Sequence, residues 1–409
     1  MLRSAAAFCL LLCGAAHASG VTLLDGTRYP RARVQSVKGK QATLLLGTET
    51  TWEVPARALL EDTHNDEAPL SGFMNLFLWN GDRMAGTVAG AGGMVKLKFA
   101  GVEGFAVPLD RVRAVHFGRT APIGTDLTYR AAFEKMLERG RDAVLVLRGE
   151  RPLPIDARVV EVGELELKVD VAGAVRTLET DRVFGFVRNP DRDPPEPEDD
   201  AVYVRLYLLS PDPNTREQKQ RGHLTIPIDE ITETQVRGAG ATIDRAIIAR
   251  MEFRGPHIAY LSEQDPIAEK ETALLGPSLK WRRDAMVRGG PMTVAGKTFA
   301  RGIGTHSYSR LEFALGRRWN TFYVECGIDD AAGPTGNAVF RVLGDGKVLA
   351  SVERKHGDPP RPLRLNVSEV DRLVLESDPN GSYTSDLCDW AQARLFSAPA
   401  FEAPPGGER

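Results

Sequence analysis

The sequence lacks the features that mark several common classes of protein. The 409-residue chain contains no H-E-x-x-H, P-loop, G-x-S-x-G or C-x-x-C motif, so the corresponding protease, nucleotide-hydrolase, serine-hydrolase and thiol-redox sites are not indicated. After the N-terminus, no segment approaches the roughly 18 apolar residues that a membrane-spanning helix needs. The 52 Lys and Arg residues nearly balance the 55 Asp and Glu residues. This balance argues against a nucleic-acid or anionic-membrane partner.

Cysteine is scarce, with four residues in the whole chain, two of them before residue 19. The other two, Cys326 and Cys388, could pair in an oxidising compartment. On the chain-entropy model, closing a loop of that length would stabilise the fold by roughly 4 kcal/mol. The alternative is two buried thiols that never meet. A disulfide requires the segments that follow the two cysteines to converge, and in that case we expect both to be oxidised.

The N-terminus has the three parts of a secretory signal peptide. Met1 to Arg3 is a short positive region, Ala5 to Leu12 is apolar, and Ala16-His17-Ala18 has the form of a cleavage site. A membrane anchor is disfavoured because the apolar run is too short, and lipidation of Cys13 because it follows the large Leu12. We therefore predict a signal peptide over residues 1–18 and a secreted or periplasmic product. Its removal takes Lys and Arg from 52 to 51 against 55 acids, a net charge of −4.

A degenerate β-repeat fills the N-terminal half, over residues 19–70, 71–119 and 120–188. In each copy an apolar run meets a Gly-containing turn suited to a hairpin, two short strands follow, and a related segment closes the copy. The closing segments are Val54 to Leu59, Val107 to Val112, and Leu178 to Val183. The pattern predicts three small β-barrel or meander units. Residues 126–139 carry apolar residues at helical spacing and predict a covering helix.

The remaining chain divides by composition. Residues 189–200 form an acidic, Pro-rich linker, residues 201–270 a β-rich connector, residues 271–398 a β-sandwich, and residues 399–409 a disordered tail. In the connector, Ile247 to Phe253 and Ile258 to Leu261 predict a hairpin around Gly255-Pro256. In the sandwich, Phe340 to Leu343 and Val348 to Val352 flank another turn, and further alternating strands follow. Such spacing is typical of an antiparallel β-sandwich.

Three separated motifs in this last region point to one family. They are Gly302-Ile303-Gly304-Thr305-His306, Gly327-Ile328-Asp329-Asp330 and Asp389-Trp390-Ala391. The glycines of the first motif predict a loop that carries His306. In this order the three motifs resemble the NPCBM family of carbohydrate-binding modules, over about Leu274 to Ser397. The resemblance implies a jelly-roll sandwich of the galactose-binding-domain type. The expected fold class is therefore mainly β, with repeated small β-barrel or meander units followed by this C-terminal sandwich.

The acidic residues of the motifs do not suggest a catalytic pair. A glycosidase needs two carboxyl groups roughly 5 to 9.5 Å apart across a sugar bond. Asp329 and Asp330 are adjacent, so on a strand they point to opposite faces. They could instead bind a structural calcium ion, which collects six to eight oxygens. The alternative is that they accept hydrogen bonds in turns and caps.

The predicted sugar site consists of four motif residues, each with an alternative role. His306 would donate to a sugar hydroxyl or be a structural histidine, and Arg301 would bind vicinal hydroxyls or form a salt bridge. Trp390, with Asp389 beside it, would stack on a sugar ring or lie in the core. A sugar platform needs an exposed aromatic side chain. The candidates in the module are Trp281, Tyr308, Trp319, Tyr323, Tyr383 and Trp390.

The expected function is non-catalytic glycan or polysaccharide binding outside the cytoplasm. Modules of this family are usually joined to a glycoside hydrolase, whereas no catalytic domain is recognisable here. The alternative is a structural or assembly protein of the cell envelope that uses its β-domains for protein contacts. A glycosidase activity is disfavoured.

Overall fold

The computed structural model describes residues 19–64, 73–118, 124–189, 201–211, 218–272, 279–381, 385–397 and 403–408. The predicted signal peptide, most of the linker, and Tyr383 lie outside these ranges. The chain divides into two compact units. One is formed mainly by residues 27–256, with 18–23 and 401–409, and the other mainly by residues 257–400. Within the described ranges, no helix is both long enough and apolar enough to cross a membrane.

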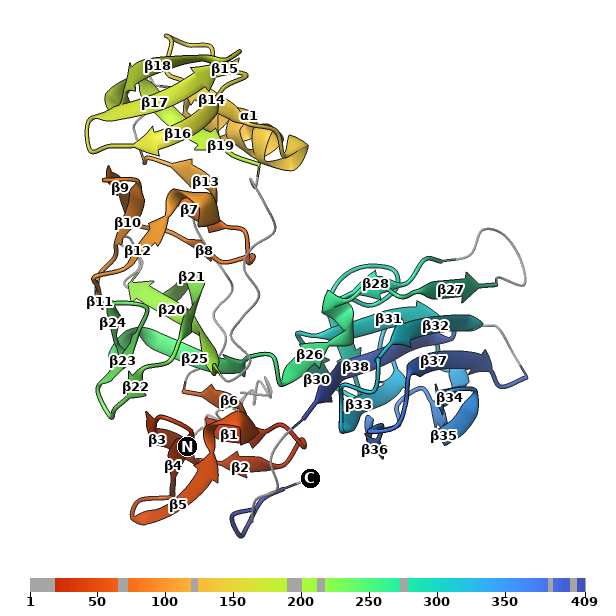
Figure 1. The fold of residues 1–409 in the computed structure, drawn as a ribbon. Coiled ribbons are helices and arrows are strands. Elements are labelled where there is room, and N and C mark those ends of the chain that lie inside the picture. Colours follow the sequence, from red (N-terminus) through yellow and green to blue (C-terminus); the bar gives the residue numbers. More distant parts are fainter. Residues whose placement is uncertain are drawn as a thin grey trace, which may run out of the picture. The chain divides into compact units, whose positions relative to one another are not determined.

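The N-terminal unit contains four copies of one β-repeat (Figure 1). Each copy has an opening hairpin, a set of short strands, a single 3-10 turn and a closing strand. The first copy comprises β1 (Gly20–Leu23), β2 (Arg28–Pro30), β3 (Arg33–Lys38), β4 (Gln41–Leu46), β5 (Thr50–Pro55) and β6 (Leu59–Thr63). The second comprises β7 (Leu76–Leu78), β8 (Arg83–Met84), β9 (Thr87–Ala91), β10 (Met94–Lys98), β11 (Val102–Glu103), β12 (Ala106–Pro108) and β13 (Val112–His116).

The third copy follows α1 (Asp126–Arg139) and comprises β14 (Ala143–Val146), β15 (Leu153–Ile155), β16 (Arg158–Val162), β17 (Glu166–Val171), β18 (Ala174–Glu179) and β19 (Val183–Val187). The fourth comprises β20 (Tyr203–Pro211), β21 (Gln218–Pro227), β22 (Glu230–Ile231), β23 (Gln235–Gly238), β24 (Ala241–Asp244) and β25 (Ile248–Arg254). The segment that the sequence analysis treats as a connector is therefore a repeat. Its opening hairpin is longer and has no short Gly turn, which hides the resemblance.

A twelve-stranded antiparallel sheet runs through all four repeats. Its order is β15-β14-β19-β13-β7-β8-β21-β20-β25-β6-β1-β2. The closing strands of the second and third repeats pair with each other, and so do those of the first and fourth. The β8–β21 pairing joins the two pairs of repeats. In space the repeats therefore follow the order third, second, fourth, first, as Figure 1 shows.

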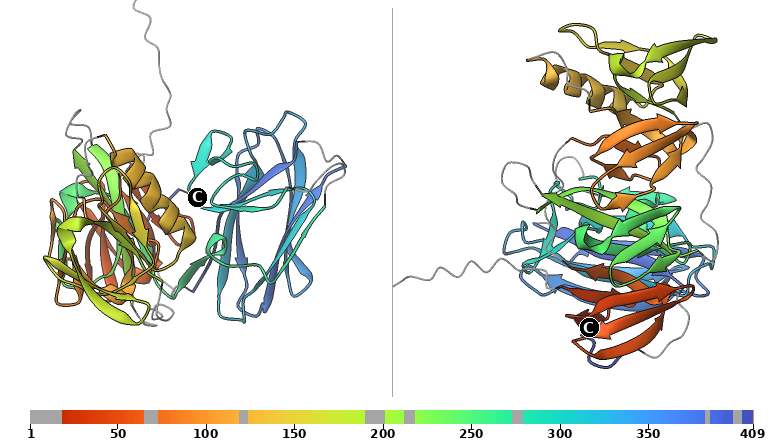
Figure 2. Two further views of the ribbon diagram at one scale, coloured as in Figure 1. Left: turned by 90° about the horizontal axis from the view of Figure 1, so that it is seen from above. Right: turned by 90° about the vertical axis from the view of Figure 1, so that its left-hand side faces the viewer.

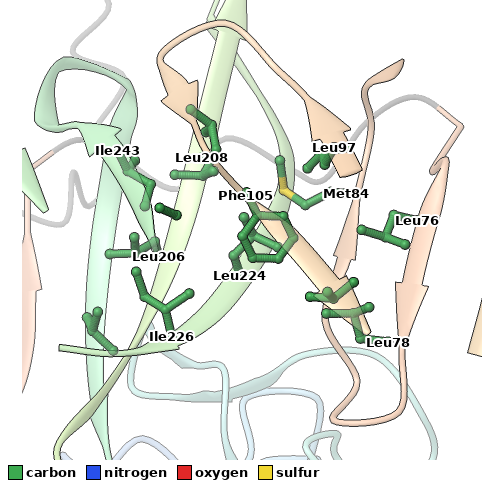
Figure 3. Close-up of a cluster of buried hydrophobic side chains, with 14 of the residues drawn as sticks. Leu76, Leu78, Met84, Leu97, Phe105, Leu206, Leu208, Leu224, Ile226 and Ile243 are labelled. Atoms are coloured by element: carbon green, nitrogen blue, oxygen red, sulfur yellow. The ribbon is translucent and has the colours of Figure 1, made fainter. Parts of the chain in front are cut away.

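Shorter strands cover this sheet and close the repeats. The first and fourth repeats form a seven-stranded sheet that β11 of the second repeat joins at β24, and the second and third repeats each also have a three-stranded sheet. Alternating apolar residues of both layers form one core. Figure 3 shows the core where the second and fourth repeats meet, with Leu76, Leu78, Met84, Leu97 and Phe105 facing Leu206, Leu208, Leu224, Ile226 and Ile243.

The outer edges of the two end strands of the long sheet differ: β2 forms backbone bonds with another segment, whereas β15 contains a proline. At β2, Arg28 and Glu408 exchange backbone N–H···O bonds of 2.8 Å, and the Tyr29 hydroxyl donates to the Pro404 carbonyl at 2.9 Å. Residues 403–408, predicted to be disordered, are therefore held against this edge by backbone bonds. The opposite end strand, β15, contains Pro154, which has no N–H to donate.

Helix α1 covers one face of the third repeat, as the apolar spacing predicts. Tyr129, Phe133 and Met136 are buried and pack with Leu145 and Phe184. The helix ends at Gly140, whose φ of 62° is the left-handed conformation that glycine adopts easily. Burial of this aromatic face attaches the helix to β14 and β19.

The C-terminal unit is an antiparallel β-sandwich, and the left view of Figure 2 shows its two layers. One sheet contains β28 (Arg282–Arg283), β31 (Gly302–His306), β38 (Leu387–Phe396), β33 (Thr321–Ile328) and β36 (Arg361–Asn366), with β26 (Ile258–Tyr260) also pairing with β38. The other contains β27 (Ala268–Glu271), β32 (Ser309–Ala314), β37 (Arg372–Pro379), β34 (Asn337–Gly344) and β35 (Lys347–Lys355). A small hairpin consists of β29 (Met292–Val294) and β30 (Lys297–Phe299).

The chain crosses between the two sheets at most connections after β31, as in a jelly roll. The predicted β34–β35 hairpin is confirmed. The predicted hairpin around Gly255-Pro256 is wrong, because β25 pairs within the repeats and β26 pairs with β38. The sandwich consequently begins near His257, before the boundary at residue 271 that composition suggested.

Candidate functional site

The first motif forms a strand, β31, and not a loop. Arg301 precedes β31 and His306 ends it. At about 3.3 Å per residue, the two positions are roughly 16 Å apart. The structure therefore places Arg301 and His306 at opposite ends of the strand, and they cannot bind one sugar ring together.

Both residues are engaged in local contacts. The Arg301 guanidinium forms a 2.6 Å ion pair with Glu263 and lies 4.7 Å from the centroid of the Tyr260 ring. It thereby ties the start of β31 to the segment after β26. His306 is half-buried, with Nδ1 2.5 Å from the Ser307 carbonyl oxygen. These contacts support the structural alternative for both residues.

Trp390 lies in the core of the sandwich. Its side chain has no exposed surface, and its ring packs edge-on against Phe340 with centroids 4.9 Å apart. The indole N–H donates to the Ser377 hydroxyl at 3.0 Å, which satisfies its one polar group. A buried indole cannot stack on a sugar, so the prediction of Trp390 as a platform is wrong.

Asp389 is buried on the other face of the same sheet and is likewise no surface contact. Its neighbours across the strands are Gly304 and Gly327, where a Cβ would collide with the covering segment near Val287 and with Val294. No N–H or hydroxyl of the described residues donates to its carboxyl oxygens. Burial, and then hydrogen bonding to Asp329, raises the pKa of Asp389 well above its usual range. A protonated Asp389 that donates to Asp329 accounts for both observations.

Asp329 and Asp330 hold backbone turns. Asp329 accepts from the N–H groups of Thr293 and Ala331 at 2.9 and 2.8 Å. Asp330 accepts from Ala295 and Gly296 at 2.7 and 2.8 Å, at the turn between β29 and β30. All four oxygens are therefore occupied, and no cluster of three potential metal ligands occurs among the described residues. This donor set supports the capping alternative for Asp329 and Asp330.

The two cysteines are free thiols in the structure. Cys326 lies opposite Trp390, and Cys388 lies opposite Ile328 on the neighbouring strand. The cysteines are thus diagonal neighbours, with Cα atoms expected about 7 to 8 Å apart, beyond the usual span of a disulfide. Burial raises the pKa of Cys326 to about 12 and raises that of Cys388 as well. The two motif strands are neighbours, as a disulfide would require, but their register places the two cysteines diagonally and not opposite each other.

A pocket of about 430 Å³ opens at one side of the sandwich. Its lining residues include Glu269 of β27 and Arg282 and Arg283 of β28, the edge strands of the two sheets, and Figure 1 shows where these two strands lie. Its lining residues are Glu269, Lys280, Trp281, Arg282, Arg283 and Ala285. This is the size of small-ligand sites in proteins, and it combines an aromatic ring with converging polar groups.

Trp281 is fixed within this pocket by both sheets. It is half-buried and packs against the sandwich core. Its indole N–H donates to Glu269 at 2.7 Å, and its backbone N–H donates to the Glu271 carboxylate. The Arg283 guanidinium lies 4.9 Å from the ring centroid. A partly exposed indole held in this way is preorganised for ligand contact.

The other aromatic candidates are less suitable. Trp319 and Tyr323 are buried, and Tyr383 lies outside the described residues. Tyr308 is half-buried, but its hydroxyl donates to Glu376 within a group of ion pairs that includes Arg310. Trp281 is among the aromatic candidates predicted from the sequence, but its charged neighbours are not part of that prediction. The run Lys280-Trp281-Arg282-Arg283 was the available signal.

The C-terminal unit is a jelly-roll β-sandwich module with a pocket at one side. Residues 258–396 match the model of the NPCBM/NEW2 domain family, which confirms the resemblance based on the three motifs. The match begins at β26 and ends at β38, in agreement with the limits of the sandwich.

Two curated proteins each align with this chain over 114 residues, 27% of its length. One, named "Putative endo-alpha-N-acetylgalactosaminidase" in Renibacterium salmoninarum, is 32% identical, and the match covers 8% of that protein. The other, alpha-1,3-galactosidase B of Akkermansia muciniphila, is 30% identical, with 14% covered. The chain thus matches a small part of each relative.

Solved structures of CBM51 modules also align with this chain. A CBM51 from Clostridium perfringens GH95, in complex with methyl-galactose, is 22% identical, covering 34% of this chain and 99% of that one, with a TM-score of 0.31. The CBM51-2 and INT domains of Clostridium perfringens ZmpB, in complex with GlcNAc, are also 22% identical. That alignment covers 42% of this chain and 37% of the other, with a TM-score of 0.32.

Proposed function

We propose that this protein binds carbohydrate through its C-terminal sandwich, with the Trp281 pocket as the binding site. The observation that carries the proposal is that the region matching the NPCBM/NEW2 family also contains this pocket. An indole beside hydrogen-bonding groups suits a sugar, which has apolar ring faces and polar edges. Both curated relatives that match part of this chain are named as glycosidases, which supports a glycan ligand.

We propose further that the binding is non-catalytic and takes place outside the cytoplasm. Glu269 is the one carboxylate that lines the pocket, and it already accepts from Trp281. Asp329 and Asp389 of the motifs are buried. Neither arrangement supplies an acid and a second carboxylate across a sugar bond. The signal-peptide pattern of residues 1–18 supports a secreted or periplasmic location.

The test is a glycan array with the mature full-length protein, followed by calorimetric titration of the best ligand. Trp281→Ala should weaken binding by about 1 to 3 kcal/mol, the range of an aromatic anchor. Tyr308→Ala is the matched control, because Tyr308 is a half-buried aromatic of the same module outside the pocket, and it should leave affinity unchanged.

Two results would count against this proposal. Binding that survives Trp281→Ala would place the site elsewhere on the module. The absence of binding to any glycan would favour the alternative, an envelope structural protein whose β-domains contact other proteins.

A further inference from the structure

The pocket beside Trp281 offers more hydrogen-bond donors than acceptors. Three of its lining residues, Lys280, Arg282 and Arg283, are cationic, and one, Glu269, is anionic. Because these groups surround a half-buried indole, their charges act on anything that contacts the ring. Only those charged groups that are not already paired within the protein are available to a ligand.

The carboxylates near the pocket are already used as acceptors. Glu269 accepts the indole N–H of Trp281, and Glu271 accepts its backbone N–H. Asp265 binds the guanidinium of Arg283, which also donates to the carbonyls of Ser262 and Gln264 at 2.8 and 2.9 Å. Arg283 is thereby held in place over the ring with its charge compensated.

Lys280 and Arg282 form no such direct contact, although the charge of Lys280 acts on the nearby Glu271 carboxylate. Arg282 donates through Nε to the Val287 carbonyl at 2.9 Å, which leaves its terminal nitrogens for other acceptors. Among the described residues, neither side chain forms an ion pair with a carboxylate. The adjoining residues 273–278, outside the described ranges, include no Asp or Glu and so add no negative charge.

From these observations we infer that the Trp281 pocket is selective for an anionic glycan, one that carries a carboxylate or sulfate group beside the stacked ring. The inference rests on the proposed function and specifies its ligand class. An arginine fork and an ammonium group are the donors that recognise such anions, and charge-assisted bonds are roughly twice as strong as neutral ones. The near-neutral charge of the whole chain implies that this selectivity is local to the pocket.

The experiment compares oligogalacturonate with the same oligomer after reduction of its carboxylates to alcohols, using the mature full-length protein. We expect the charged oligomer to bind about tenfold more tightly or better, as charge-assisted bonds predict. The Lys280→Gln/Arg282→Gln variant should lose this preference and bind the reduced oligomer as the wild type does. Lys347→Gln, an exposed cation at the β34–β35 turn, is the control and should change neither affinity.

The arms of the experiment separate the possible outcomes. Tighter binding of a sulfated galactan than of oligogalacturonate would assign the anion to a sulfate ester and support the inference. Equal affinity for charged and reduced oligomers, or an unchanged preference in the double variant, would overturn it while leaving glycan binding intact. Equal affinity for a single-stranded oligonucleotide would also overturn it, by showing unselective polyanion attraction. The failure of every glycan to bind would reject the proposed function itself.

Discussion

The residues that make the C-terminal motifs recognisable are residues that the fold needs. Trp390 and Cys388 point into the core, Asp389 is buried on the opposite face, and Gly304 and Gly327 let covering segments approach the sheet. The three motif strands β31, β38 and β33 are neighbours at the centre of one sheet. Ligand contacts can therefore differ between relatives while these motifs remain.

Trp390→Ala should destabilise the sandwich by about 3 to 5 kcal/mol, the usual cost of truncating a buried aromatic side chain. Trp281→Ala should cost much less, because that indole is partly exposed. Urea denaturation of the two variants gives the comparison. A loss below about 1 kcal/mol for Trp390→Ala would contradict its placement in the core.

Asp389→Asn should stabilise the protein relative to the wild type, and this difference in stability should grow as the pH rises. Because the pKa of Asp389 is raised in the folded state, the wild-type residue stabilises the fold at low pH and loses that contribution as the pH rises above about 4. An amide can still donate to Asp329 and does not ionise. The difference in unfolding free energy between variant and wild type should be smallest near pH 4 and grow with pH. A flat profile for Asp389→Asn would refute the assignment.

The sequence was sufficient to find these residues but not to assign their roles. Alternation along β38 places Asp389 and Trp390 on opposite faces, but it does not say which face is covered. Segment 285–294 covers the Asp389 face, and that is a tertiary contact without a local signal. The same limit applies to Cys326 and Cys388, because the sequence shows neither that their strands are neighbours nor that the two cysteines are diagonal in register.

Among the elements, α1 and β31 show where local sequence patterns predict the secondary structure correctly and where they do not. The helical spacing of Tyr129, Phe133 and Met136 was sufficient to predict α1 and its buried face. The glycines of Gly302–Gly304 suggested a loop, but they permit close packing within a strand. Likewise the fourth repeat was missed, although Ile243-Asp244-Arg245 followed by Ile248 has the form of the other closing segments.

The aromatic cluster under α1 contains His116 and should make this element sensitive to acid. The His116 ring lies 4.3 Å from Phe184 and 4.6 Å from Phe73, measured between centroids. Burial, and then the charge of Arg130, lowers its pKa to about 4. The stability that comes from a neutral His116 is complete above pH 6.5 and is lost as the pH falls toward 4, by about 3 kcal/mol in total.

His116→Phe should remove this acid-dependent loss, because phenylalanine fits an aromatic site and does not titrate. Denaturation midpoints of wild type and variant measured from pH 7 to pH 4 should diverge as the pH falls. Parallel midpoints over this range would show that His116 does not couple protonation to stability.

At the scale of the whole molecule, the repeats pair in space in a different order from the sequence. The second and third repeats complete each other through β13 and β19, whereas the first depends on the fourth through β6 and β25. β3 of the first repeat also pairs with β22 of the fourth. Folding of the first repeat therefore requires contacts about 190 residues away along the chain, as those register pairs show.

A fragment of residues 73–189 should unfold cooperatively, because it contains one complete pair of repeats. A fragment of residues 19–118 is similar in size but joins two repeats that are not partners, so it should show no cooperative transition. Circular dichroism during thermal denaturation distinguishes the two fragments. A monomeric, cooperative 19–118 fragment would contradict the pairing.

Each end strand of the long sheet carries a feature that opposes pairing with a further strand. A sheet that grows by adding strands usually leaves an unpaired edge on which another molecule can assemble. Here Arg28 on the β2 edge already exchanges backbone bonds with Glu408 of the same chain, and the β15 edge is interrupted by Pro154, which cannot donate a ladder bond. Each end of the long sheet is therefore a poor template for strand addition by a further copy of the protein.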